Sequence, residues 1–141
     1  MSYKITPTED LDACMAIRFT VFVDEQGVPA EIEHDDYDMV ARHLLATKNG
    51  RPVGTARIVL QGSAGKIGRV AVLKEARGTG LGAALVRACE KEMKKLPEVK
   101  ETILTAQTSA LGFYEKLGYV AEGDEFEDAG IPHLLMRRPL R

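Results

Sequence analysis

A glycine-rich turn is the part of this 141-residue chain best suited to binding a phosphate group. It reads Arg77-Gly78-Thr79-Gly80-Leu81-Gly82 and stands where the pattern of a long amphipathic helix begins. Three glycines in five residues leave the backbone N–H groups open to close approach by a ligand. The first N–H groups of a helix have no partners within the helix and lie at the positive end of its dipole. The turn therefore predicts a site for a phosphate or pyrophosphate.

The elements on either side of this turn would hold it at the end of a sheet. A hydrophobic strand over residues 66–73 comes before it, and a helix over about 79–96 follows, stopped by Pro97. Apolar residues recur along that helix at helical spacing. They are Leu81, Leu85, Ala88, Cys89, Met93 and Leu96.

The rest of the chain alternates short strands with helices. A capping box at Thr6-Pro7-Thr8-Glu9 predicts the start of a first helix that runs to about Phe22. An acidic loop with seven carboxylates follows over Asp24–Asp38, and Asn49-Gly50 predicts a hairpin. The expected strands are 2–5, 42–48, 52–61, 101–106, 118–122 and 133–138, with a short helix at 108–117. Antiparallel hairpins followed by a β-α-β segment predict a mixed α/β sheet.

Composition and length indicate one ordinary globular domain over residues 1–141. The net charge of −2 gives no basic field for nucleic acid or an anionic membrane. The apolar runs are too short to span a bilayer, and the N-terminus lacks the pattern of a signal peptide, so we expect a cytoplasmic protein. No Cys/His cluster predicts a metal site, and Cys14 and Cys89 are expected to be small hydrophobic residues rather than reactive thiols.

The glycine turn has a second interpretation as a dinucleotide-binding fingerprint. Gly78-x-Gly80-x-x-Ala83 fits that pattern, which would make the protein an NAD(P)-dependent oxidoreductase. However, residues 73–77 separate the turn from its strand, and the following strand ends in Thr105-Ala106-Gln107 without the acidic residue that binds a ribose. A Walker loop is also excluded, because no Gly-Lys-Ser/Thr follows the turn.

Two motifs in this order resemble the GNAT superfamily of N-acetyltransferases. Arg77-x-x-Gly80-x-Gly82 looks like its coenzyme A pyrophosphate loop, and the stretch from Gln107 to Tyr119 is similar to its second motif, Asn-x-x-Ala-x-x-Phe-Tyr-x-x-x-Gly-Phe. Arg18–Pro29 and Gly130–Met136 resemble a subgroup of small bacterial members, many of which have no assigned acceptor. The resemblance implies a single-domain α/β fold with a mixed, mostly antiparallel central sheet flanked by helices. It also implies acetyl-CoA as cosubstrate.

The resemblance assigns roles to particular residues. The backbone of the signature strand would pair with the pantetheine arm, the glycine turn would hold the pyrophosphate, and Gln107 replaces the more frequent asparagine that bonds the pantetheine. Tyr114 falls near the coenzyme sulfur, where it would act as general acid. The residues expected to bind the coenzyme are Val70, Ala71, Val72, Arg77, Gly78, Thr79, Gly80, Leu81, Gly82, Ala83, Gln107 and Tyr114.

The general base and the acceptor site are less closely defined. Glu25 is the first candidate for the base, because it follows the first helix, which borders the acceptor cleft in this fold. Glu33, Asp35 and His133 are further candidates and are expected to contact the acceptor. An acidic loop facing the cleft would favour a cationic acceptor such as a polyamine, an amino sugar or a lysine side chain.

The sequence thus predicts an N-acetyltransferase in which the primary amine of a small molecule or peptide attacks acetyl-CoA directly. The alternative is a catalytically silent module that binds or senses acyl-CoA. Members of the family often form homodimers, so a homodimer is a further expectation from the resemblance.

Overall fold

A single seven-stranded sheet forms the centre of the fold within residues 3–140, the part of the chain that the computed structural model describes. The strand order is β1-β2-β3-β4-β5-β7-β6. Every neighbouring pair is antiparallel except β4 and β5, which are parallel, and this confirms the predicted mixed, mostly antiparallel α/β sheet. The strands are β1 (Lys4–Thr8), β2 (Arg42–Lys48), β3 (Arg51–Gln61), β4 (Ala64–Val72), β5 (Glu101–Gln107), β6 (Val120–Asp128) and β7 (Ile131–Pro139).

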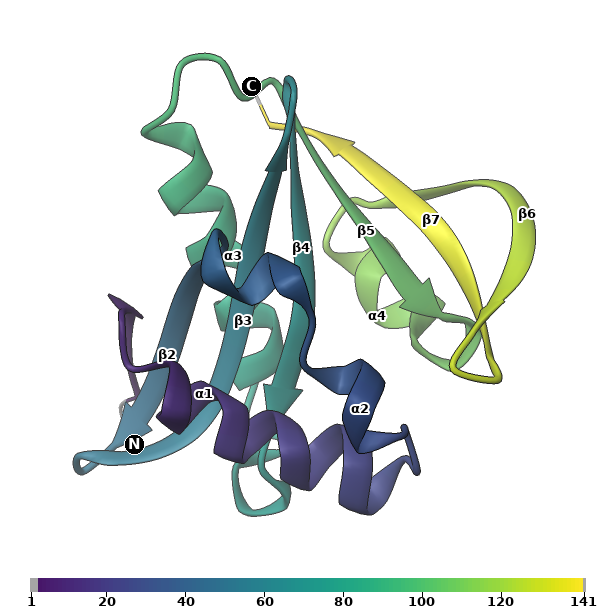
Figure 1. The fold of residues 1–141 in the computed structure, drawn as a ribbon. Helices are drawn as coiled ribbons and strands as arrows, with labels where there is room; N and C mark the ends of the chain where they lie inside the picture. The colour runs from purple at the N-terminus through teal and green to yellow at the C-terminus, as the bar shows by residue number, and fades with distance from the viewer. Residues whose placement is uncertain (1–2, 141) are drawn as a thin grey trace.

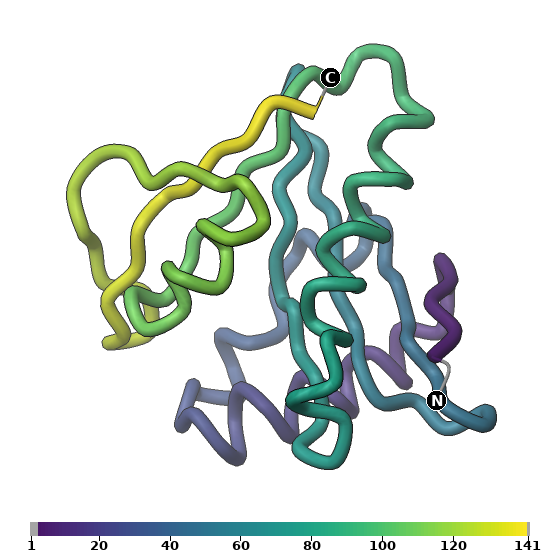
Figure 2. The backbone as a smooth tube through the Cα atoms, turned by 180° about the vertical axis from the view of Figure 1, so that it is seen from behind, coloured from purple at the N-terminus to yellow at the C-terminus, as the bar shows by residue number. Residues whose placement is uncertain are grey.

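Helices cover both faces of this sheet. The helices α1 and α2 lie in front of it in Figure 1, whereas α3 lies across the opposite face, as Figure 2 shows from behind. The α-helices are α1 (Leu11–Arg18), α2 (Ala30–Glu33), α3 (Leu81–Lys94) and α4 (Leu111–Lys116). A π-helix, η1 (Phe19–Glu25), continues α1, and 3-10 turns occupy η2 (Asp36–Met39), η3 (Lys74–Ala76) and η4 (Thr108–Ala110). No helix in the described part of the chain is long and apolar enough to cross a membrane.

The start of the first helix differs from the sequence prediction. Thr6 and Pro7 belong to β1, which pairs with β2, so the predicted capping box is wrong. Ladder hydrogen bonds with β2 determine this segment, and Pro7 is tolerated because β1 is an edge strand. The helix begins instead after Asp10, whose side chain accepts a 3.1 Å hydrogen bond from the N–H of Ala13. Of the strand predicted over residues 2–5, Ser2 lies outside the described residues.

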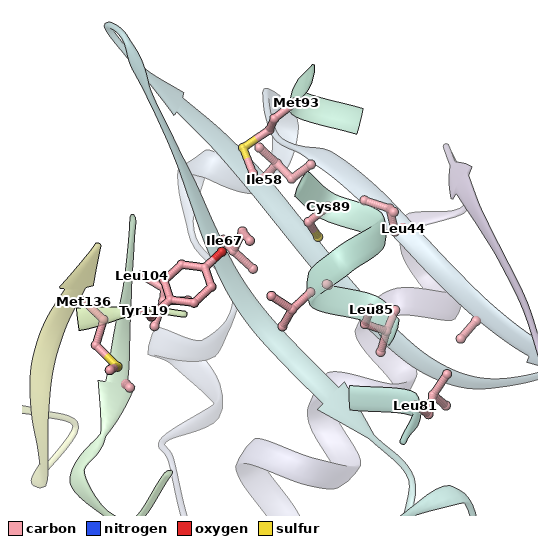
Figure 3. Close-up of a cluster of buried hydrophobic side chains, with 14 of the residues drawn as sticks. Leu44, Ile58, Ile67, Leu81, Leu85, Cys89, Met93, Leu104, Tyr119 and Met136 are labelled. Atoms are coloured by element: carbon pink, nitrogen blue, oxygen red, sulfur yellow. The ribbon is translucent and has the colours of Figure 1, made fainter. Parts of the chain in front are cut away.

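The apolar face of α3 builds the main core. Figure 3 shows Leu81, Leu85, Cys89 and Met93 facing the strands from successive turns of this helix. All four are buried, as the helical spacing predicts, and burial raises the pKa of the Cys89 thiol. The helix lies so close to β4 that a Cβ atom on Gly65 would fall 2.1 Å from the Met93 sulfur. This packing fixes α3, and with it the glycine turn, at one end of β4.

The C-terminal hairpin is longer than predicted. The strand expected over 118–122 extends to Asp128, and every residue of β6 is exposed. An edge strand with both faces in water has no apolar alternation, so periodicity gives no signal for its second half.

Candidate active site

The sheet splits between β4 and β5, and a cleft opens at the split. The two strands pair only from Ala64 to Lys66, opposite Glu101 to Ile103, and then diverge, as Figure 1 shows. The resulting cleft has a volume of about 530 Å³ and is lined from β3, β4, β5, β7 and the 22–37 segment. This volume suits a small-molecule site.

A β-bulge in β4 faces this cleft. Gly68 pairs with Arg57 and Ala71 with Thr55, so Arg69 and Val70 together stand opposite one residue of β3. Arg69 adopts the left-handed conformation with φ of 50°, a backbone state that occurs often at functional sites. Of the signature-strand residues, Val70 lines the cleft, Ala71 is buried and Val72 is half-buried. Because the pairs with β5 end at Lys66, the backbone beyond it can pair with a ligand.

The glycine turn leads into α3 with its first N–H groups unpaired within the helix. Gly78 and Gly80 have φ of 76° and 84°, conformations that strain any residue with a Cβ atom. The first helical bond runs from the N–H of Ala84 to the carbonyl of Gly80, and no side chain caps this end. The N–H groups of Leu81 to Ala83 are therefore available to an anion. A Cβ atom on Gly82 would lie 3.4 Å from the ring of Phe113, which places α4 beside this turn.

The end of η1 contacts two of the residues predicted to bind the coenzyme. Arg77 donates a 2.5 Å hydrogen bond to the Glu25 carboxylate and a 2.9 Å bond to the carbonyl of Val72. The amide of Gln107 donates a 2.8 Å bond to the side chain of Gln26. Glu25 is thus ion-paired, and it is not among the residues that line the cleft.

Tyr114 reaches the cleft from α4. Its ring makes edge contacts with Phe113 and Tyr119, at centroid distances of 4.9 and 6.2 Å. Burial, with a smaller contribution from Cys89, raises the pKa of Tyr114 to about 12. The hydroxyl is therefore protonated at neutral pH. Within residues 3–140 it has no hydrogen-bond partner, so it can donate to a bound ligand.

His133 lines the cleft from β7, directly opposite Gln107 in the sheet register. Its Nδ1 atom lies 2.7 Å from the carbonyl oxygen of Ile131. A carbonyl can only accept, so Nδ1 carries the hydrogen and Nε2 of the neutral ring keeps its lone pair. The ring stacks on Phe126 at 6.0 Å between centroids. The arrangement fixes both the tautomer and the orientation of a potential base.

A buried ion network underlies the front of the cleft. Arg18 bonds Glu33 at 2.6 Å and Asp38 at 2.7 Å, and all three side chains are almost fully buried. Arg57 bonds Asp38 at 2.9 Å and Asp35 at 2.7 Å. Arg69 completes the network with a 3.2 Å contact to Asp35. The network places three arginines against three carboxylates, so its formal charge is zero.

Sequence reasoning did not find the arginine side of this network. Arg18 is the last residue of α1, while Arg57 and Arg69 interrupt apolar strands. Such interruptions are the available signal, since a charge within a buried strand needs an opposite charge nearby. The pairing also corrects the argument for a cationic acceptor. Glu33 is 2% exposed and Asp35 is held by two arginines, so neither offers free negative charge to the cleft.

Comparison with known proteins identifies the family. A model of the acetyltransferase (GNAT) domain matches residues 7–140. A Bacillus subtilis relative, provisionally named an acetyltransferase, is 44% identical over 138 residues, covering 96% of this chain and 93% of its own. The structure superposes with a TM-score of 0.90 on a Lactobacillus plantarum protein provisionally named an N-acetyltransferase, at 27% identity and with both chains fully covered. The structure also superposes on an acyl-CoA N-acyltransferase from Pseudomonas aeruginosa with a TM-score of 0.84. The identity is 30%, and the alignment covers 97% of this chain and 98% of the other.

The chain therefore belongs to the GNAT family of acetyltransferases. Membership of this family and a sheet with one parallel pair rule out the doubly wound fold of the dinucleotide interpretation.

The ion network makes a prediction for stability. Replacing Arg18 by Met leaves Glu33 and Asp38 buried without their main partner, so we expect a loss of about 3–5 kcal/mol in the free energy of unfolding at pH 7. The matched control is Arg51→Met, which removes an exposed ion pair with Glu75 and should cost less than about 1 kcal/mol. Urea denaturation followed by circular dichroism measures both. Equal losses for the two variants would contradict this account.

The pH dependence of that loss follows from the aspartates. Burial opposes ionisation of Asp38, but the hydrogen bond and charge of Arg18, with Arg57, outweigh it and hold its pKa well below the usual range. The pKa of Asp35 is lowered in the same way by Arg57 and Arg69. Aspartates titrate near 3.9 in the unfolded chain, so this stabilisation is complete above about pH 4 and is lost as the pH falls further. The difference in the free energy of unfolding between wild type and Arg18→Met should therefore decrease below about pH 4.

Proposed function

We propose that the protein transfers an acetyl group from acetyl-CoA to a primary amine by direct attack. One observation carries the proposal: the unpaired edge of β4 is followed, after η3 and the glycine turn, by the uncapped N-terminus of α3. A pyrophosphate at the glycine turn and a pantetheine arm along β4 would bring the thioester to the cleft. Backbone N–H groups at the glycine turn suit a pyrophosphate. The unpaired backbone groups of β4 suit a pantetheine arm that pairs like a strand.

The chain supplies donors where negative charge develops. A backbone N–H of the Val70–Val72 stretch would polarise the thioester carbonyl. Tyr114 would donate a hydrogen bond to the departing thiolate. Because its pKa is about 12 and a thiol has a pKa of about 8.5, the phenol stabilises the thiolate rather than protonating it fully. This refines the general-acid role expected from the sequence.

We assign the general base to His133 in place of Glu25. An amine is mostly protonated at neutral pH and must lose a proton before it attacks. The Nε2 lone pair of His133 can take that proton inside the cleft, because Nδ1–H is already bonded to the Ile131 carbonyl. Glu25 is ion-paired with Arg77 outside the cleft lining. Its contact suits a positioning role for the pyrophosphate-binding arginine better than proton abstraction.

A route through an acetylated cysteine is disfavoured. Cys14 and Cys89 are both fully buried, neither lines the cleft, and burial raises the pKa of each thiol. A thiolate nucleophile needs exposure and a lowered pKa. Direct transfer is the route that the available groups support.

Coenzyme binding is the first test. Gly80→Glu puts a Cβ atom on a residue with φ of 84° and a negative charge beside the pyrophosphate, so we expect calorimetric titration to show no saturable binding of acetyl-CoA. The matched control is Gly123→Glu, which has the same charge change and a φ of 79° but lies on the exposed β6. Wild type should prefer coenzyme A to NADH. No binding of coenzyme A by wild type would refute the proposal.

Tyr114→Phe separates an enzyme from a silent binding module. Removing one donor to a developing anion lowers kcat by roughly 10²–10³-fold, and the affinity for acetyl-CoA should change by less than about threefold. Thiol release measured with an excess of a primary amine gives kcat. Tyr3→Phe, at a tyrosine that does not line the cleft, serves as control. Wild-type protein that binds coenzyme but acetylates no amine would support the sensor module instead.

His133→Gln tests the base. We expect kcat/KM to fall by roughly 10²-fold at neutral pH. The deficit should shrink as the pH approaches the pKa of the acceptor amine, about 10 for an alkylamine and about 8 for a peptide N-terminus, because the amine then arrives deprotonated. A purely structural role for His133 would give a deficit that does not change with pH. Glu25→Gln in the same assay should raise KM for acetyl-CoA more than it lowers kcat.

A further inference from the structure

The charged side chains of the cleft are unequally paired. The cleft is lined by six side chains that carry a formal charge. Four of them belong to the ion network: Glu33, Asp35, Arg57 and Arg69. The other two, Lys66 and Asp128, have no ion-pair partner among residues 3–140. Because the network is neutral, these two groups set the electrostatic character of the cleft.

Lys66 and Asp128 lie at opposite ends of the cleft. Lys66 is the last residue of β4 that pairs with β5, so it stands where the cleft is narrowest, opposite Ile103. Asp128 is the last residue of β6 and pairs with Ile131, which lies two positions before His133 on β7. The cleft is therefore positive at the closed end and negative beside the proposed base.

The register gives the separation of these ends. Gln107 lies four residues beyond Ile103 along β5 and pairs with His133. Four residues of strand span about 13 Å, and the lysine stem can cover part of that distance, so a ligand that meets both ends has charges roughly 7–13 Å apart.

The surroundings make the lysine charge significant. Lys66 is half-buried, and the apolar side chains of Val59 and Leu104 line the same cleft. A partly desolvated ammonium group gains from an opposite charge much more than an exposed one does. In the described chain that opposite charge is missing, and a bound ligand would provide it.

We propose that the acceptor is an extended zwitterion: a primary amine held near Asp128 and His133, joined to an anionic group bound by Lys66. Short peptides with a free N-terminus and C-terminus, and ω-amino acids, belong to this class. The inference rests on the proposed function and names the acceptor class for the same site. A polyamine does not fit, because its second ammonium group would lie against Lys66.

Two acceptors that differ only in one charge test this directly. Extended triglycine is about 10 Å long. Triglycinamide has the same length but carries a neutral amide in place of the C-terminal carboxylate. We expect wild type to acetylate triglycine with a kcat/KM about tenfold higher, which corresponds to one charge-assisted contact. Lys66→Gln should reduce that ratio to about one, and Lys66→Arg should keep most of it. Lys91→Gln, at an exposed position of α3, should leave the ratio as in wild type.

The outcomes distinguish this inference from the proposed function. The zwitterion proposal is wrong if wild type binds coenzyme A but acetylates both compounds equally or prefers the amide. A wild-type preference that Lys66→Gln retains overturns the assignment to Lys66. If neither compound is acetylated, calorimetric titration of triglycine into protein saturated with coenzyme A decides, and no binding overturns the inference. Comparing 6-aminohexanoate with 6-aminohexyl phosphate then shows whether the anionic group is a carboxylate or a phosphate. Failure to bind coenzyme A counts against the proposed function itself.

Discussion

The parting of β4 from β5 after three paired residues is the constraint on which the site depends. An internal strand normally satisfies its backbone groups on both sides, so a split sheet leaves polar groups that need other partners. The bulge at Arg69 follows three residues beyond the last pair, and the tight approach of α3 at Gly65 anchors the paired end. The backbone groups left over are a ready template for a ligand that can add itself as a strand.

The ion network supports the split from the front face. It joins α1 to the 33–38 segment and both to β3 and β4 through Arg57 and Arg69. Buried ion pairs of this kind add little net stability compared with well-packed apolar residues, because desolvation offsets their attraction. Their geometry is directional, however, and hydrogen bonds from Arg69 to the Glu33 carbonyl tie the bulge to α2. The network thus fixes where the cleft wall stands, more than how stable the domain is.

Sequence patterns predicted those elements whose conformation depends mainly on neighbouring residues in the chain. Helical spacing located α3, and Asn49-Gly50 located the β2–β3 hairpin. The glycine turn has left-handed backbone angles at Gly78 and Gly80, and the anion site expected there stays a prediction. The ion network was not predictable from spacing, because its partners come together only when four separate segments pack. The predicted start of the first helix was wrong for a related reason. The segment Thr6-Pro7-Thr8-Glu9 has a good capping pattern, but its first residues pair with a strand some forty residues away.

The turn at the end of η1 links the two halves of the site. Glu25 and Gln26 bond Arg77 and Gln107, the side chains expected to hold the coenzyme, while Phe22 and Gln26 also line the cleft. π-Helical geometry is uncommon and frequently occurs at functional sites, and here it precedes this turn directly. A coenzyme that engages Arg77 and Gln107 must compete with these contacts, so its binding acts on a segment that also shapes the acceptor cleft. In the proposed function, one short stretch between α1 and α2 would therefore influence the binding of both substrates.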